Sequence, residues 1–168
     1  MKKILIACLL WLGLCLNVHA EGMFKLSHLC KEDVMNMIKC KVDEGVSADD
    51  AISSMKLRAN LLNFKLVGEM PLSKQVAAMG GKSNRMEIFQ FCDAMIAAKM
   101  VKYSMAFAGY LPCRISLVLD DSGQAWLITL NMDKTMNDAS LPKGLKSLGM
   151  KVRNNIYSII TAGAEGDL

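Results

Sequence analysis

The sequence predicts an α+β fold of two layers, in which helices pack on one face of a single mixed sheet of about five strands. Two observations predict it. Apolar and polar residues alternate in several short runs, most clearly over residues 113–119, and this period of two is typical of strands. Between these runs, apolar residues recur every three or four positions, which is typical of helices that bury one face. The predicted order is strand, helix, strand, strand, helix, strand, strand and helix.

The first 20 residues have the pattern of a signal peptide. Lys2 and Lys3 form a basic start, residues 4–16 form an apolar core, and residues 18–20 suit cleavage before Glu21. The apolar core has about 13 residues, whereas about 20 are needed to span a bilayer. We therefore expect a cleaved signal, export to the periplasm, and no stable membrane insertion after cleavage.

The rest of the chain has the size of one domain. Residues 21–34 are expected to form an N-terminal arm, and residues 35–168 a single α+β domain. From Glu21 onward there are 18 basic and 16 acidic residues without a basic stripe, so we expect no nucleic-acid partner. His28, the one histidine after the predicted signal peptide, is treated as ordinary surface. A three-histidine zinc site, a bis-histidine haem or a Ser-His-Asp triad is therefore hard to assemble.

The first predicted elements follow the arm. Residues 23–33 show no clear period and are expected to be an arm or a short helical turn, whereas residues 35–42 are predicted to form a strand. Ser47 is a good N-cap, and Asp50 stands close to a capping-box position. The helix that follows has one apolar face, formed by Ile52, Met55, Ala59 and Leu62.

The second strand is predicted over residues 64–70 and is ended by Pro71, and residues 73–79 are predicted to form a short helix. The glycine-rich string at residues 80–84 resembles part of a phosphate-binding loop. We exclude that motif because its upstream glycine is missing and no long helix follows. The string is therefore expected to be a flexible connection.

The third strand is predicted over residues 86–92 and has two different faces. We expect Cys92 to point to the apolar side with the helices, and Phe89 and Phe91 to point to the outer side. The first face carries Met86, Ile88, Gln90 and Cys92, and the second carries Glu87, Phe89 and Phe91. Asp93 can cap a helix over residues 94–104, whose apolar stripe is Ile96, Met100, Tyr103 and Phe107.

A hairpin is predicted around residues 120–123, whose sequence is typical of a tight turn. A three-residue loop would pair Asp120 with Gln124, and a four-residue loop would pair Leu119 with Gln124. We favour the four-residue loop because it gathers large apolar side chains on one face. Its pairs would be Leu117 with Trp126, Ile115 with Ile128, and Cys113 with Leu130. Arg114 would then lie level with Thr129.

The C-terminal part is predicted to be a polar connection that contains Pro142, followed by a helix. The helix has Val152, Ile156 and Ile159 on one face and Ala162 at its edge. Gly163 is its expected stop.

The outer sheet face is predicted to form a homodimer. It is expected to carry Phe89, Phe91, Val118 and Leu127, interleaved with Glu87, Arg114 and Ser116. Such an apolar patch is rarely left exposed to solvent in a monomer, and protein interfaces favour this mixture of aromatic residues and arginine. In the competing interpretation, the N-terminal arm or the C-terminal helix covers that face.

Four cysteines remain after signal cleavage, and an even number in an oxidising compartment raises the expectation of disulfides. The disulfide candidates are Cys30, Cys40, Cys92 and Cys113, which allow three pairings. Cys92 and Cys113 could form a structural disulfide, remain as buried thiols, hold a metal, haem or small ligand, or act as a redox pair, although no C-x-x-C motif is present. An extended return over residues 105–111 would bring them together, and a compact parallel crossover would separate them.

Arg114 is either a solvated side chain or an anchor for an anionic ligand or a partner chain. The thirteen methionines after the signal could favour Cu(I), but several of them occupy predicted core positions, where methionine is a filler. We assign no metal ligands, and no cofactor can be named.

Several motifs together resemble the bacterial domain-of-unknown-function family 302. They are residues 87–93 (EIFQFCD), residues 97–100, residues 110–115 (YLPCRI), residues 121–123, residues 126–127 and residues 130–131. The combination of a cysteine with a later Pro-Cys-Arg is the most specific part and resembles the exported branch. Asp93-Ala94 departs from the Asn-Pro of many relatives. The resemblance covers residues 35–168 and implies a two-layer α/β fold and possible dimers, but no established activity.

These observations favour an exported, non-enzymatic binding or accessory module. Its ligand site is expected near Cys92, Cys113 and Arg114. The alternative is a thiol-dependent redox or metal-handling protein that uses Cys92 and Cys113.

Overall fold

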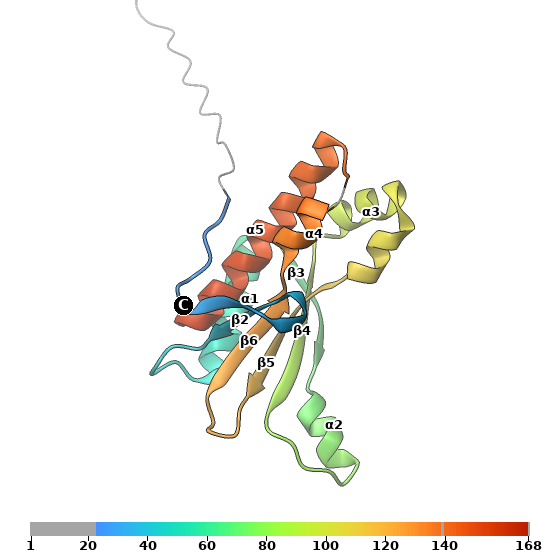
Figure 1. Ribbon diagram of the computed structural model, residues 1–168. Helices are drawn as coiled ribbons and strands as arrows, with labels where there is room; N and C mark the ends of the chain where they lie inside the picture. The colour runs from blue at the N-terminus through green and yellow to red at the C-terminus, as the bar shows by residue number, and fades with distance from the viewer. Residues whose placement is uncertain (1–22, 139, 168) are drawn as a thin grey trace, which may run out of the picture.

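The computed structural model describes residues 23–138 and 140–167, so the predicted signal peptide lies outside the described part. The fold is α+β, with one six-stranded sheet in this part of the chain (Figure 1). Each neighbouring pair of strands is antiparallel, so the expected mixed sheet is wrong. In spatial order the strands are β1 (Cys30–Asp33), β2 (Met37–Lys41), β6 (Ala125–Leu130), β5 (Cys113–Leu119), β4 (Met86–Cys92) and β3 (Lys65–Met70).

Helices cover one face of this sheet, as predicted. The helices α1 (Ala48–Leu61) and α5 (Lys143–Glu165) lie side by side on that face (Figure 1). At one end of the sheet lie α3 (Ala94–Tyr103), a 3₁₀ helix η2 (Met105–Tyr110) and α4 (Met132–Asp138). The short α2 (Leu72–Ala78) projects at the opposite end, and a 3₁₀ turn η1 (Val34–Asn36) joins β1 to β2.

The predicted helix starts are confirmed by their caps. The Ser47 hydroxyl accepts a hydrogen bond from the Asp50 backbone N–H at 3.1 Å. The Asp93 carboxylate accepts hydrogen bonds from the N–H groups of Met95 and Ile96 at 3.0 and 3.1 Å. Each cap satisfies N–H groups that have no partner within the helix.

The predicted stop at Gly163 is wrong, because α5 continues to Glu165 and is capped by Gly166 with φ of +68°. Gly163 belongs to α5 and is buried where this helix packs against α1. A Cβ at this position would lie 2.5 Å from Met55 Cγ and 3.1 Å from the Ala51 carbonyl oxygen. The glycine therefore allows the two helices to pack closely.

Residues 23–29 of the N-terminal arm form no helix, and Cys30–Asp33 form the edge strand β1. This strand pairs with β2 so that Cys30 lies opposite Cys40, and a disulfide joins the two residues. The arm therefore supplies the sixth strand. The cross-link sits within a hairpin and closes a short loop, so it restricts the unfolded chain locally.

The hairpin between β5 and β6 has the three-residue loop, and the favoured four-residue loop is wrong. The Asp120 N–H donates to the Gln124 carbonyl oxygen at 3.0 Å, and Leu117 lies opposite Leu127. The reason is the Asp120 carboxylate. It accepts hydrogen bonds from Ser122 and from Trp126 Nε1 (2.8 Å), which lower the pKa of Asp120 to about 2. These side-chain bonds to Asp120 stabilise the three-residue register.

The two faces of β4 are the reverse of the prediction. Phe89 and Phe91 are fully buried on the helix-covered face, opposite Ile115 and Cys113. Glu87 shares this face at the end of the strand, where Arg85 pairs with it at 2.6 Å. That pairing makes a carboxylate tolerable on the buried side.

The outer face consequently lacks Phe89, Phe91 and Leu127, all of which were assigned to the dimer. The register places other apolar side chains there, namely Ile88, Val118, Trp126 and Ile128, interleaved with Arg114 and Ser116. A homodimer through this face stays a prediction, now with a different set of residues.

Candidate functional site

A cavity of about 80 Å³ lies at the end of the sheet where β4 stops and β5 starts. Its walls come from α3, η2, α4 and α5 together with the strand ends. Most of its lining is apolar, with Phe64, Ile96, Met100, Phe107, Leu111 and Val152 among the contributing residues. Its few polar groups include Arg114 and the two hydroxyl residues Thr129 and Thr135.

Cys92 and Cys113 both line this cavity, and both are free thiols. Cys92 is the last residue of β4 and Cys113 the first of β5, so the antiparallel pairing brings them to the same end of the sheet. From the sequence, the two cysteines were expected to come together only if residues 105–111 formed an extended segment. These residues are in fact compact, and the cysteines still come together because α3 and η2 start and finish at the same end of the sheet.

Both cysteines were expected on the helix-covered face, and this is wrong for Cys92 but correct for Cys113. Cys113 lies opposite Phe91 and shares its buried face, so Cys92, one residue further along β4, belongs to the other face. Residues from both faces line the cavity, which therefore reaches around the end of the sheet.

Burial keeps both thiols protonated. Burial, with a smaller contribution from the neighbouring Cys92, raises the pKa of Cys113 to about 12. Burial also raises the pKa of Cys92, with a second contribution from the Asp93 charge. A thiol attacks as its thiolate, so neither side chain is a strong nucleophile near neutral pH.

We expect Cys113 to react with iodoacetamide at least about a hundredfold more slowly in the folded protein than in denaturant at pH 8, since its raised pKa leaves little thiolate. The folded-state rate should rise as the pH increases towards 12. Peptide mass spectrometry measures the rate. Without reductant, denatured protein should be labelled at Cys92 and Cys113 but not at the bridged Cys30 and Cys40. Equal folded and unfolded rates for Cys113 would show that its thiol is accessible and ionised.

Arg114 lies on the outer face and is exposed, as the sequence predicted. The predicted register was off by one residue, because Ile115 rather than Arg114 lies opposite Thr129. The Thr129 hydroxyl donates to the Arg114 carbonyl oxygen at 2.7 Å and so fixes the backbone at the cavity rim. The Arg114 side chain remains available to a ligand or to solvent.

Sequence reasoning missed two sulfur-bearing residues of the lining, Met132 and Met136. Both belong to α4, which was predicted to be a polar connection. Gly149 of α5 makes room for one of them, because a Cβ at Gly149 would collide with the Met136 sulfur. With Met100, Cys92 and Cys113, these residues bring five sulfur atoms to the cavity wall.

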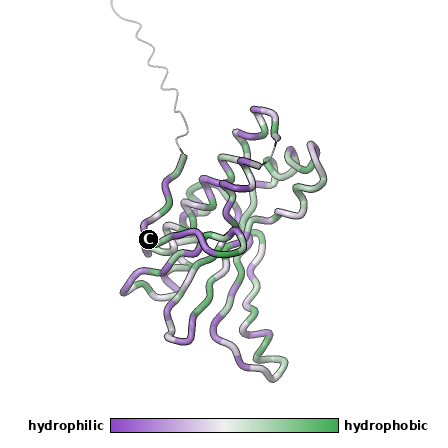
Figure 2. Tube along the Cα trace, in the orientation of Figure 1, coloured by the Kyte–Doolittle hydropathy of each residue, from purple (hydrophilic) through white to green (hydrophobic). Residues whose placement is uncertain are grey.

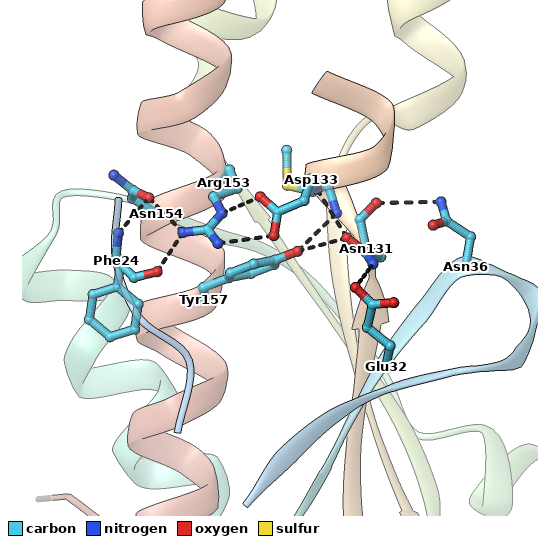
Figure 3. A network of polar contacts seen from close by, with 9 residues as sticks. Phe24, Glu32, Asn36, Asn131, Asp133, Arg153, Asn154 and Tyr157 are labelled. Atoms are coloured by element: carbon cyan, nitrogen blue, oxygen red, sulfur yellow. Dashed lines mark hydrogen bonds and ion pairs between the residues drawn. The ribbon is translucent and has the colours of Figure 1, made fainter. Parts of the chain in front are cut away.

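A buried polar network holds α4 against α5 (Figure 3). Arg153 is buried, and its guanidinium pairs with the Asp133 carboxylate through two hydrogen bonds of 2.8 and 3.0 Å. It also donates to the Phe24 carbonyl oxygen at 2.6 Å and lies 4.1 Å from the centre of the Tyr157 ring. The Arg153 side chain therefore connects the N-terminal segment, α4 and α5.

Asn131 extends the network to β1 (Figure 3). It accepts a hydrogen bond from the Tyr157 hydroxyl at 3.2 Å and donates one to Glu32 at 3.1 Å. Because Asn131 stands immediately before α4, these contacts fix the start of the helix that carries Met132 and Met136. The network is thus a support for one wall of the cavity.

The described residues contain neither a metal-binding cluster nor a membrane-spanning helix. In residues 23–138 and 140–167, no three His, Cys, Asp or Glu side chains come together in a way that could hold a metal ion. None of the helices in this part of the chain is both long and apolar enough to cross a bilayer.

Comparison with known proteins identifies the family. The family described as "Domain of unknown function DUF302" matches residues 38–163. A crystal structure of the uncharacterized conserved protein DUF302 from Bacillus stearothermophilus is similar, with a TM-score of 0.61 and 16% identity over 76% of this chain and 98% of that chain. At this identity the similarity shows the fold alone. No curated protein matches. The chain therefore belongs to the DUF302 family, whose function is unknown.

Proposed function

We propose that the protein is an exported binding module that holds a small apolar ligand in the cavity at the end of the sheet. The observation that carries this proposal is the cavity itself, which is apolar and bounded by four helical segments. Protein interiors are close-packed, so an apolar space with a few polar groups at its rim is a candidate ligand site. Its volume of about 80 Å³ is below the ~300–1,000 Å³ of drug-sized pockets, so the ligand is expected to be very small or to extend out through the rim. Arg114, at the rim, suits the polar or anionic end of such a ligand.

The state of the cysteines supports a binding module over a thiol-dependent redox protein. A redox-active pair needs an accessible thiolate of lowered pKa. Burial raises the pKa of both Cys92 and Cys113, which is the opposite shift. The two thiols then serve as small apolar wall residues.

Methyl NMR of the methionines tests this function. Small apolar probes, with indole as the first, are expected to shift the methyl signals of Met100, Met132 and Met136, which line the cavity. The signal of Met79, which is exposed beyond α2, should not move. Shifts spread over all methionines, or absent for every apolar probe, would contradict a specific cavity site.

Filling the cavity should abolish this binding. Ala97 lines the cavity, and we expect Ala97→Leu to weaken indole binding at least tenfold because the added side chain occupies the ligand space. Ala98→Leu is the matched control, because Ala98 is the next residue of α3, is exposed and lies outside the lining. Equal binding by both variants would place the ligand elsewhere.

A soft metal ion is the second candidate, favoured by the five sulfur atoms of the lining. Thiolate and thioether ligands select Cu(I). Cu(I) would replace a thiol proton of Cys92 or Cys113 and release it to solvent. In the same NMR experiment, a shift of the three cavity methyls with Cu(I), lost in Cys92→Ser, would favour this candidate over the apolar ligand.

Export rests on the sequence pattern of the first 20 residues. Mass spectrometry of the protein recovered from the periplasm is expected to show a chain that begins at Glu21. A chain that retains Lys2 and Lys3 would contradict export with cleavage.

A further inference from the structure

The segment formed by α3 and η2 exposes an unusual number of apolar side chains. Met95 and Met105 are 73% and 83% exposed, and Tyr103 and Tyr110 are 51% and 50% exposed. A helix on the surface of a soluble protein normally turns polar residues outward. We call this set, together with Lys99 and Lys102, the α3 surface.

Basic side chains predominate in this region, although the Asp93 carboxylate caps the start of α3. From Ala94 to Leu119 the chain contains no aspartate or glutamate, whereas Lys99 and Lys102 are exposed on α3. Lys134 of α4 lines the same surface groove as Tyr103 and Tyr110. The Tyr103 hydroxyl also donates to the Ser140 carbonyl oxygen at 3.5 Å, so the segment before α5 lies against the α3 surface. On α4, the Asp133 carboxylate is already paired with Arg153.

The α3 surface also stands out from the body of the protein. In Figure 1, α3 and η2 (yellow) lie at the upper right, away from the sheet and next to the start of α5. Figure 2 shows mainly hydrophobic colour along this segment. Such a projecting segment can reach a flat surface without interference from the rest of the protein.

We propose that the α3 surface docks the protein onto a membrane that contains anionic lipids. Methionine side chains enter the boundary between headgroups and acyl chains, and tyrosine places its ring there while its hydroxyl stays in the polar layer. Lysines next to these side chains attract anionic headgroups. The protein would lie on the membrane and not span it.

The composition favours a lipid surface over a protein partner. Residues 94–111 contain Lys99 and Lys102 but no Asp or Glu, so no acidic side chain within this segment would repel anionic headgroups. The two lysines match a polyanionic surface. This proposal concerns the outside of α3 and does not depend on a ligand in the cavity, although the same segment forms one cavity wall.

Vesicle co-sedimentation tests the proposal. We expect the purified protein to bind vesicles of phosphatidylcholine with about 30% phosphatidylglycerol at low salt, and to bind weakly at about 0.5 M salt, where charges are screened. Replacing both Lys99 and Lys102 by alanine should lower the partition coefficient about 30-fold. Met105→Asp should lower it at least tenfold, because a charge replaces an inserted apolar side chain.

Matched controls come from the opposite end of the protein. Met79 is 88% exposed next to α2, so Met79→Asp makes the same chemical change away from the α3 surface (Figure 1). The exposed Lys74 and Lys82 serve in the same way for the double lysine variant. Both control variants should bind vesicles as the unchanged protein does.

Three results would overturn the proposal. The first is no binding to the anionic vesicles. The second is equal binding by all variants, which would assign the affinity to another part of the chain. The third is a protein that ignores vesicles but self-associates in sedimentation experiments, with the association lost in Met105→Asp, which would make the α3 surface a protein interface.

Discussion

Replacing Phe89 by alanine is expected to lower the free energy of unfolding by about 3–5 kcal/mol. Phe89 is fully buried on the helix-covered face of the sheet, opposite Ile115. Its ring also lies 5.5 Å from the Lys56 ammonium group of α1. Removing the ring leaves a cavity between two layers that cannot close fully, so the cost exceeds that of the lost apolar surface alone. Urea unfolding measures the change.

Ile88→Ala is the matched control, because Ile88 is the preceding residue on the same strand but lies on the outer face and is half-buried. We expect a loss of about 1 kcal/mol, since part of this side chain already faces solvent. The comparison of these two variants shows which face of β4 packs against the helices. A larger loss for Ile88→Ala than for Phe89→Ala would mean that the outer face is the packed one, as the sequence suggested.

The sequence misassigned these faces because both sets of β4 side chains are largely apolar. The alternation of residues shows that a strand exists and which residues share a face. It does not show which of the two faces packs against the helices. Glu87 shares the buried face with Phe89 and Phe91, and its partner Arg85 is apparent only in the structure. By contrast, the helix starts at Ser47 and Asp93 were predicted correctly, because a cap depends on residues within one turn.

The candidate site shows the same division between local and long-range information. Cys92 and Cys113 were identified by their positions at strand ends, and antiparallel pairing does bring them to one cavity. Met132 and Met136 were missed because α4 is short and lacks a clear apolar period. Its position depends on Arg153, a residue twenty positions from Asp133, and no sequence pattern links the two.

Replacing Asp133 by alanine is expected to lower the free energy of unfolding by about 3 kcal/mol. The substitution leaves the Arg153 guanidinium buried without its counter-charge. The Phe24 carbonyl oxygen still accepts from Arg153, but a neutral acceptor does not replace a carboxylate. We place the loss at the lower end of the range for buried pairs because Asp133 itself is partly exposed. Urea unfolding again measures the change.

An exposed ion pair supplies the control. Lys56 and Glu69 pair at 2.8 Å, but both side chains are more than a third exposed. Glu69→Ala should therefore cost less than about 1 kcal/mol. Equal losses of unfolding free energy for Glu69→Ala and Asp133→Ala would show that the Arg153 network stabilises the fold no more than an exposed ion pair does.

A double variant separates the lost counter-charge from lost packing. Adding Arg153→Met to Asp133→Ala removes the stranded charge, so the double variant should be more stable than Asp133→Ala alone. The recovery should be partial, because the Phe24 carbonyl oxygen then loses its donor. Since Asp133 belongs to the first turn of α4, Asp133→Ala should also move the Met136 methyl signal, while Glu69→Ala should not. That combination would tie the stability of the network to the shape of the cavity wall.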